Sequence, residues 1–170
     1  IQMNEQSGAV ALGARRFLVA YNVNLNSQSV ELAKKLAAQI RESGAKVQIG
    51  ENLVHQPGKL RCVKAIGWYM QQYQCAQVSM NLTNIDETPL HVVFAELEHL
   101  AHAAGLEITG SELVGLIPKS QLLGVAHHLC NLNISDEVPE LEYLAQAAKR
   151  LKLQVPQPFS PQRQVLEYAM

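Results

Sequence analysis

The most regular stretch of the chain, from Ala76 to Asn84, alternates apolar and polar residues. Side chains of a β-strand point to opposite sides with a period of two, so this stretch predicts a strand with one apolar and one polar face. The polar face carries only uncharged side chains, namely Gln77, Ser79, Asn81 and Thr83. A strand face that only meets water usually carries Lys, Glu or Arg as well. This row therefore indicates a surface that recognises a ligand through hydrogen bonds.

The pattern predicts three further strands. Phe17–Asn24 alternates in the same way, and its second face ends in the amides Asn22 and Asn24. The other two are Lys59–Met70, which is apolar and aromatic, and Leu106–Ile117.

Apolar residues at helical spacing predict four helices. The first is capped by Ser27 or Ser29 and ends at Gly44. The second begins with Thr88 as N-cap and Pro89 at N1. It ends at Gly105, and two more helices are expected over 119–132 and 138–153. The rest is expected to be irregular: a connector at 1–13, a loop at 45–57 and a turn at 71–74. The proline-containing tail is expected to be extended as far as 162–168.

The order of these elements predicts an α+β fold, a ferredoxin-like βαββαβ sandwich with additional C-terminal helices. In that topology the first and third strands lie side by side, and both helices pack on one face of the sheet. The apolar sides of the strands then face the helices. The opposite face carries Asn22 and Asn24 beside the amides and hydroxyls of 77–83, and no helix before Pro118 is placed to cover it.

Composition narrows the class of protein. The chain has 170 residues and a net charge of −1, without an Arg/Lys cluster, which argues against a nucleic-acid binder held by phosphate contacts. It has no run of eighteen apolar residues, so no membrane-spanning helix is expected. Cys62, Cys75 and Cys130 lack CxxC spacing and are interpreted as buried or idle thiols in a reducing cytoplasm.

Other residues of chemical interest have plain structural readings. His99 and His102 lie three apart beside Glu98, in the order Glu-His-x-x-His, and no third metal ligand is evident. They are interpreted as solvent-facing helix residues. Trp68 and Tyr69 would suit ring stacking, but alternation predicts that one of them packs in the core. Gly67 before them indicates a bulge or a close backbone approach.

Several segments resemble glutamate formiminotransferase, in the order that this family has them. Residues 13–25, GARRFLVAYNVNL, are similar to its run GAR-FLIA(F/Y)N(I/V)NL. Further similar blocks are KAIGWY at 64–69, AQVSMNLTN at 76–84, TGSELVGLIP at 109–118, and PFSP at 158–161 with LEY at 166–168. Met80 departs from the family, which usually has Thr there. Its parity places it on the helix-packed face, so little effect on a ligand is expected.

The resemblance implies a function and a place in a longer chain. Members of this family transfer a formimino group from N-formimino-L-glutamate to tetrahydrofolate in histidine breakdown. Two similar subdomains hold the folate in a tunnel between them. Residues 14–170 resemble the second, carboxy-terminal subdomain, and 1–13 the end of a connector from the first. The family's catalytic histidine lies in that first subdomain, so no catalytic residue and no metal are expected here, and this chain alone is expected to be inactive.

The implied partners are folate, N-formimino-L-glutamate and the amino-terminal subdomain, with no nucleic acid or membrane, and with self-association left open. A pterin ring carries donors and acceptors in one plane, and amides satisfy both. The predicted folate-binding residues are Asn22, Asn24, Lys64, Gln77, Ser79, Asn81 and Glu112. Lys59, Arg61 and Lys64 are either partners for substrate carboxylates or a solvated set on an edge strand. Glu112 either binds the amino-pyrimidine side of a pterin or lies at a strand end in water.

One alternative from a different class of function stays open. In this alternative the chain is a non-catalytic binding or dimerisation module, and its open sheet face pairs with a partner.

Overall fold

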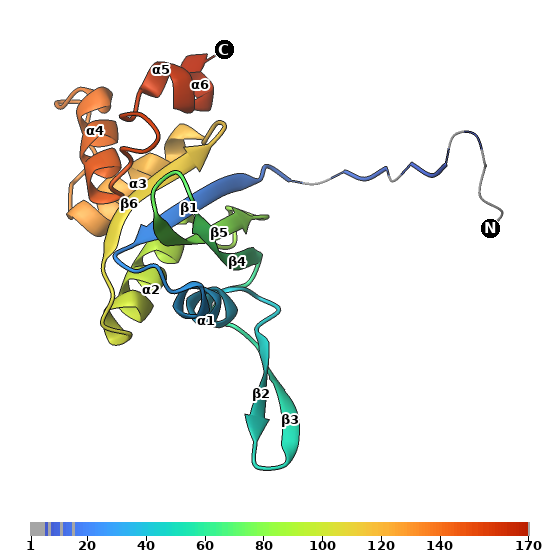
Figure 1. The fold of residues 1–170 in the computed structure, drawn as a ribbon. Helices are drawn as coiled ribbons and strands as arrows, with labels where there is room; N and C mark the ends of the chain where they lie inside the picture. The colour runs from blue at the N-terminus through green and yellow to red at the C-terminus, as the bar shows by residue number, and fades with distance from the viewer. Residues whose placement is uncertain (1–5, 7, 11, 15, 170) are drawn as a thin grey trace.

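A four-stranded antiparallel sheet forms the centre of the protein (Figure 1). The computed structural model describes residues 6, 8–10, 12–14 and 16–169; residues 1–5, 7 and 11 of the predicted connector, Arg15 and Met170 lie outside the described residues. The strands of this sheet are β1 (Val19–Leu25), β4 (Val63–Met70), β5 (Cys75–Leu82) and β6 (Ile108–Val114). Their spatial order is β4-β5-β1-β6, and all three pairings are antiparallel.

Two helices complete the predicted order. Helix α1 (Val30–Ile40) follows β1, and α2 (Leu90–Ala103) joins β5 to β6. The resulting βαββαβ order, with β1 and β5 in the centre, confirms the α+β ferredoxin-like sandwich. Ser29 accepts a hydrogen bond from the backbone N–H of Leu32 at 3.3 Å, which confirms it as the N-cap of α1.

The apolar side of the sheet forms the core with these helices. Tyr21, Val23, Val78 and Met80 lie on one side in register and are fully buried against them. Gly67 on β4 lies on the same side, and a side chain there would come within 2.2 Å of the backbone nitrogen of Lys34 on α1. The close backbone approach expected at this glycine is confirmed, and it sets how near α1 lies to the sheet.

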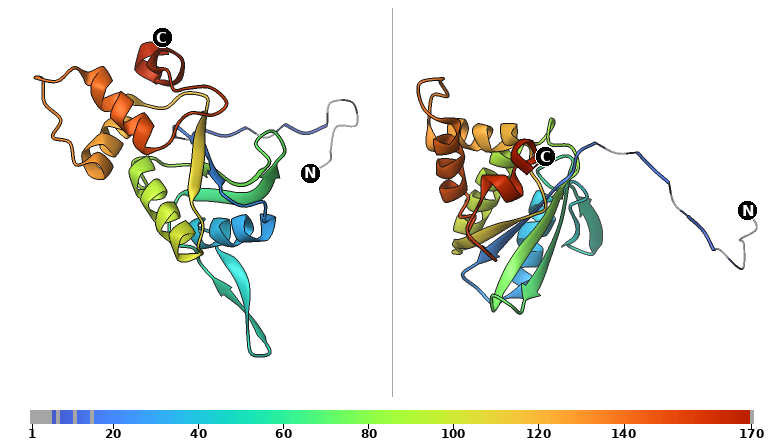
Figure 2. Two further views of the ribbon diagram at one scale, coloured as in Figure 1. Left: turned by 60° about the vertical axis from the view of Figure 1, so that its left-hand side comes forward. Right: turned by 90° about the horizontal axis from the view of Figure 1, so that it is seen from above.

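The additional C-terminal helices extend the helical layer past the edge strand β6. Helices α3 (Lys119–Cys130) and α4 (Glu140–Arg150) pack beside α2 (Figure 2), and two short helices follow, α5 (Pro161–Gln164) and α6 (Leu166–Ala169). The backbone N–H of Ser111 on β6 donates to Lys152 O at 2.8 Å. The residues after α4 therefore occupy part of the outer edge of β6.

The segment 45–57 is not irregular, so that expectation was wrong. It forms a β-hairpin of β2 (Ala45–Ile49) and β3 (Asn52–Gln56), which projects from the body near α1 (Figure 1). A two-residue Gly50–Glu51 turn between short apolar-containing runs is the local signal of such a hairpin. Both strands are largely exposed, so the alternation that marks a strand packed against a core is weak.

The start of α2 also differs from its prediction. Pro89, rather than Thr88, occupies the N-cap position. The Thr88 hydroxyl instead donates to Arg61 O at 2.7 Å, and the N–H of Leu90 donates to the side-chain oxygen of Gln121 at 3.0 Å. A side chain from α3 thus satisfies a free N–H of the helix that Thr88 had been expected to cap.

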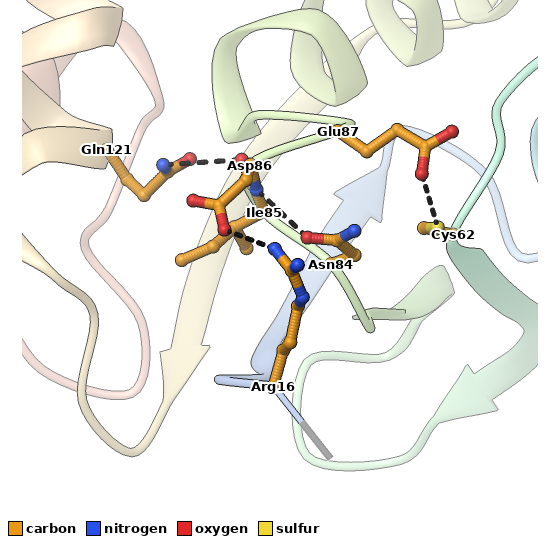
Figure 3. A network of polar contacts seen from close by, with 7 residues as sticks. All are labelled: Arg16, Cys62, Asn84, Ile85, Asp86, Glu87 and Gln121. Atoms are coloured by element: carbon orange, nitrogen blue, oxygen red, sulfur yellow. Dashed lines mark hydrogen bonds and ion pairs between the residues drawn. The ribbon is translucent and has the colours of Figure 1, made fainter.

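The loop from β5 to α2 is held from several sides, as Figure 3 shows. Arg16 donates to Asp86 at 2.9 Å, and Gln121 donates to Ile85 O at 3.5 Å. The Cys62 thiol donates to Glu87 at 3.4 Å. The described residues ahead of Arg16 are exposed and run away from the body (Figure 1), and the Arg16–Asp86 pair joins the residue after them to this loop.

Candidate binding face of the sheet

The seven predicted folate-binding residues all lie on the sheet face opposite α1 and α2. The register places Asn24 opposite Gln77, Asn22 opposite both Ser79 and Glu112, and Asn81 opposite Lys64. Side chains opposite one another in an antiparallel pair share a face. We call this side the polar face. Its residues are Ala20, Asn22, Asn24, Lys64, Ile66, Trp68, Gln77, Ser79, Asn81, Gly110, Glu112 and Val114.

One half of the polar face is a closed hydrogen-bond network, which we call the inner half. The Gln77 amide nitrogen donates to Asn24 Oδ1 at 2.7 Å, and its oxygen accepts from the Trp68 indole N–H at 2.7 Å. Glu112 accepts from Asn22 at 2.8 Å and from the hydroxyl of Tyr73 at 3.3 Å. Asn22, Asn24 and Gln77 are buried. These bonds therefore hold the side chains of the inner half to one another.

Glu112 is the centre of this network and its only charged member. A longer contact of 3.5 Å joins it to the Gln77 nitrogen, so amides and a phenol surround its two oxygens. Within the described part of the chain it forms no ion pair with a Lys or Arg. Burial, and then the Glu112 charge, raise the pKa of the Tyr73 hydroxyl. The carboxylate is thus held by neutral donors and stays available to a ligand donor.

The other half of the polar face, the outer half, is open. Lys64 and Asn81 are exposed and Ser79 is half-buried, and none of the three side chains hydrogen-bonds another described residue. Ile66 and Val114 lie beside them, each 57% exposed. Free donors and acceptors next to exposed apolar groups are what a binding site offers a ligand with both kinds of surface.

The structure corrects two expectations about neighbouring residues. Neither Trp68 nor Tyr69 is a core residue: they are 40% and 36% exposed, because β4 is the edge strand of the sheet. The Thr83 hydroxyl does not serve the polar face either. It lies past the end of β5 and donates to Cys62 O at 2.9 Å.

The basic cluster predicted at 59–64 is divided. Lys59 pairs with Glu96 at 2.5 Å, and Arg61 pairs with Glu87 at 3.1 Å. Only Lys64 lies on the polar face. One cation of the three is therefore left to meet a ligand carboxylate there.

A hollow of about 470 Å³ opens at the inner end of the polar face. Asn24 lines it together with Tyr73, Thr109, Gly110 and Val155. Tyr73 and Val155 were not predicted from the sequence, because a turn residue and a tail residue carry no strand parity. Ile66 and Val114 were not predicted either, although their even positions beside Lys64 and Glu112 were a usable signal.

The histidines form no evident site. His99 and His102 are exposed on α2, and across the described residues no three His, Cys, Asp or Glu side chains are arranged to hold a metal ion. His91 stacks on His128 at 4.2 Å between ring centroids. Burial, and then the His128 and His127 rings, lower the pKa of His91. In the described residues no helix is long and apolar enough to cross a membrane.

The chain is similar to known proteins over most of its length. Residues 20–170 match the formiminotransferase domain. Formimidoyltransferase-cyclodeaminase of Gallus gallus is 39% identical over 96% of this chain and 29% of its own length, and that of Dictyostelium discoideum is 40% identical over 95% and 28%. Glutamate formimidoyltransferase of Thermoplasma acidophilum is 35% identical over 86% of this chain and 44% of its own length.

The fold and its single polar sheet face define an α+β sandwich that carries a candidate binding surface. By sequence, the chain belongs to the formiminotransferase domain family. It spans less than half the length of these curated relatives.

Proposed function

We propose that this chain is the folate-binding half of a glutamate formimidoyltransferase, which transfers a formimino group from N-formimino-L-glutamate to tetrahydrofolate. The observation that carries the proposal is the outer half of the polar face, where Lys64, Ser79 and Asn81 present unused hydrogen-bonding groups beside the fixed inner network. The names of the similar proteins support formimino transfer as the reaction class. The polar face supports folate binding as the role of this half.

The two halves of the polar face suit different tasks. The inner half is rigid because its amides already hold one another, so it can back a flat ring without rearranging. The outer half supplies an amide, a hydroxyl and an ammonium group for ring edges and a carboxylate. A buried ligand donor or acceptor without a partner would cost about 1–3 kcal/mol, so such groups decide orientation as well as affinity.

This half contributes positioning, and the acid–base group is expected in an amino-terminal half that closes over the polar face. The face is an open surface in its outer part, which supports the need for such a covering lobe. Holding two substrates in register can lower a barrier by several kcal/mol even without a chemical group of its own. Residues 1–13 then connect the two halves, and residues 14–170 form the second subdomain. The three free thiols support a cytoplasmic location as part of the same proposal.

Asn81→Leu tests the placement of the ligand. Tetrahydrofolate affinity of the full-length transferase should fall about 5- to 10-fold, because one or two hydrogen bonds to the ligand are lost. Asn52→Leu is the matched control, since Asn52 is also an exposed strand amide but lies on the hairpin. Equal affinities of wild type and Asn81→Leu would contradict the placement.

The non-catalytic module remains the second candidate, favoured by one observation: the amides of Gln77 and Asn24 bond each other without any ligand. An assay of formimino transfer separates the two. The full-length protein should be active and the 170-residue chain inactive. An inactive full-length protein that still binds a partner through the polar face would favour the module.

A further inference from the structure

A second surface lies away from the polar face, on the side of α1 and the hairpin. Helix α1 packs on the apolar side of the sheet, and β2 and β3 form a separate two-stranded sheet beside it. We call residues 34–41, from α1 and its C-cap, together with hairpin residues 45–57 the hairpin surface. It shares no residue with the polar face.

The hairpin exposes large apolar side chains. Ile49 and Leu53 are 61% and 62% exposed, and Val54 is 42% exposed. Leu53 lies opposite Gln48, and Val54 opposite Val47, so the apolar groups occur on both sides of the ribbon. A two-stranded ribbon on its own is marginally stable in water, so contact with a second surface would favour it.

The base of the hairpin is fixed. Arg41 donates to Gly44 O at 2.7 Å, and the N–H of Lys59 donates to Gln39 O at 2.8 Å. Gly44 has a φ of +55°, and a side chain there would come within 1.9 Å of Gln56 O, so the two ends of the hairpin cross in close contact. The hairpin is thus held at a set angle to α1 before any partner arrives.

A basic hollow of about 410 Å³ lies between α1 and β2. Lys35, Lys46 and Lys59 line it around Ala38 and Val47, and no carboxylate is among its lining residues. Lys59 is paired with Glu96, whereas Lys46 forms no ion pair with a described residue.

The positive charge of Lys35 is only partly balanced by a nearby carboxylate. It shares the field of Glu31 with Lys34, which pairs with that carboxylate at 2.9 Å. The chain as a whole has a net charge of −1, so this surface concentrates positive charge against the overall balance.

We propose that the hairpin surface binds an extended, acidic and partly apolar segment of a partner protein, which adds a strand to the free edge of β2. Strand β2 has one neighbour, β3, so its other edge is available for main-chain hydrogen bonds beside the basic hollow. Acidic side chains of the segment would meet Lys35 and Lys46, and alternate apolar ones would cover Val47 and Ile49. The lysines of the hollow favour a partner segment with acidic side chains. The free edge of β2 favours a segment with an extended backbone.

A fluorescein-labelled octapeptide of alternating Glu and Val is the probe, followed by anisotropy. It should bind at least tenfold more tightly than an octapeptide of alternating Lys and Val, and the affinity should fall as salt rises. In the 170-residue chain the variant K35E/K46E should weaken binding at least tenfold. Lys149→Glu is the matched control, because Lys149 is an exposed helix lysine on α4.

A further variant tests the apolar contact between the peptide and the hairpin. Ile49→Ser should weaken binding at least threefold, and Leu141→Ser, which alters an exposed leucine on α4, should leave it unchanged. In wild-type protein, amide NMR shifts on titration should gather at 46–49. No binding of the Glu-Val peptide, or equal loss in Lys149→Glu, would overturn the proposal. Equal binding of an octapeptide of Glu alone would replace it with a plain anion site.

Discussion

The two halves of the polar face share one strand pattern and differ in what their side chains do. In the inner half the Gln77 side chain forms hydrogen bonds with Asn24, Trp68 and Glu112. In the outer half Ser79 and Asn81, on the same strand parity as Gln77, make no such bonds. Burial separates them: Gln77 is fully buried, and Asn81 is exposed. Uncharged polar side chains on one face therefore form a structural network where they are covered and a candidate binding surface where they are open.

Gln77→Leu should have the largest effect on stability. The change keeps the shape of the side chain but removes the partners of the Trp68 N–H and Asn24 Oδ1. One partly buried and one buried polar group without partners cost about 2–4 kcal/mol in the free energy of unfolding. Urea unfolding followed by far-ultraviolet circular dichroism measures it. A loss below about 0.5 kcal/mol would mean that the inner half is no network.

Glu112→Gln should cost about 1–2 kcal/mol, because the hydrogen bonds from Asn22 and Tyr73 lose their charged acceptor. The same unfolding experiment applies. Glu107→Gln is the matched control, since Glu107 is exposed beside the start of the same strand. A similar change in both variants would show that the surroundings of Glu112 do not matter.

Tyr73 makes the inner half sensitive to alkaline pH. Its pKa is higher in the folded protein than in the unfolded chain, so the folded state retains the proton longer and stability falls as pH rises above about 10. Stability measured from pH 8 to 11 should decline less in Tyr73→Phe than in wild type. Identical declines would indicate that the Tyr73–Glu112 contact does not form in solution.

Substitutions in the outer half should have the smallest effect on stability. Ser79→Ala and Asn81→Leu should change the free energy of unfolding by less than about 0.5 kcal/mol, because they remove no bond within the chain. The same variants should lower tetrahydrofolate affinity. A destabilisation comparable to that of Gln77→Leu would erase the difference between the two halves.

Alternation alone predicted the shared face but not its division. Parity placed Asn22, Gln77 and Asn81 on one side of the sheet correctly. It gave no sign that Asn22 would bond Glu112, 90 residues further along the chain, because that contact arises only when β1 pairs with β6. Tyr73 was missed for a similar reason. It comes from a turn, and turns have no periodic relation to the face they reach over.

The hairpin shows a different limit of prediction from the sequence. Val47 and Ile49 before the turn and Leu53 after it were visible in the sequence, and the two-residue Gly50–Glu51 turn was the available signal. Apolar side chains normally predict burial, but Val47 is only partly buried and Ile49 and Leu53 are exposed, so the segment resembled neither a core strand nor a polar loop. The resemblance to a family supplied the expected ligand, which no local pattern contains.

The most direct test of the central claim is an NMR titration of the 170-residue chain with tetrahydrofolate, observing the side-chain amides of its Asn and Gln residues. The account predicts that the Asn81 amide and the backbone signals of Lys64 and Ser79 shift first, while the Asn52 amide on the hairpin does not move. Shifts confined to the helical side of the sheet, or none at all, would contradict it.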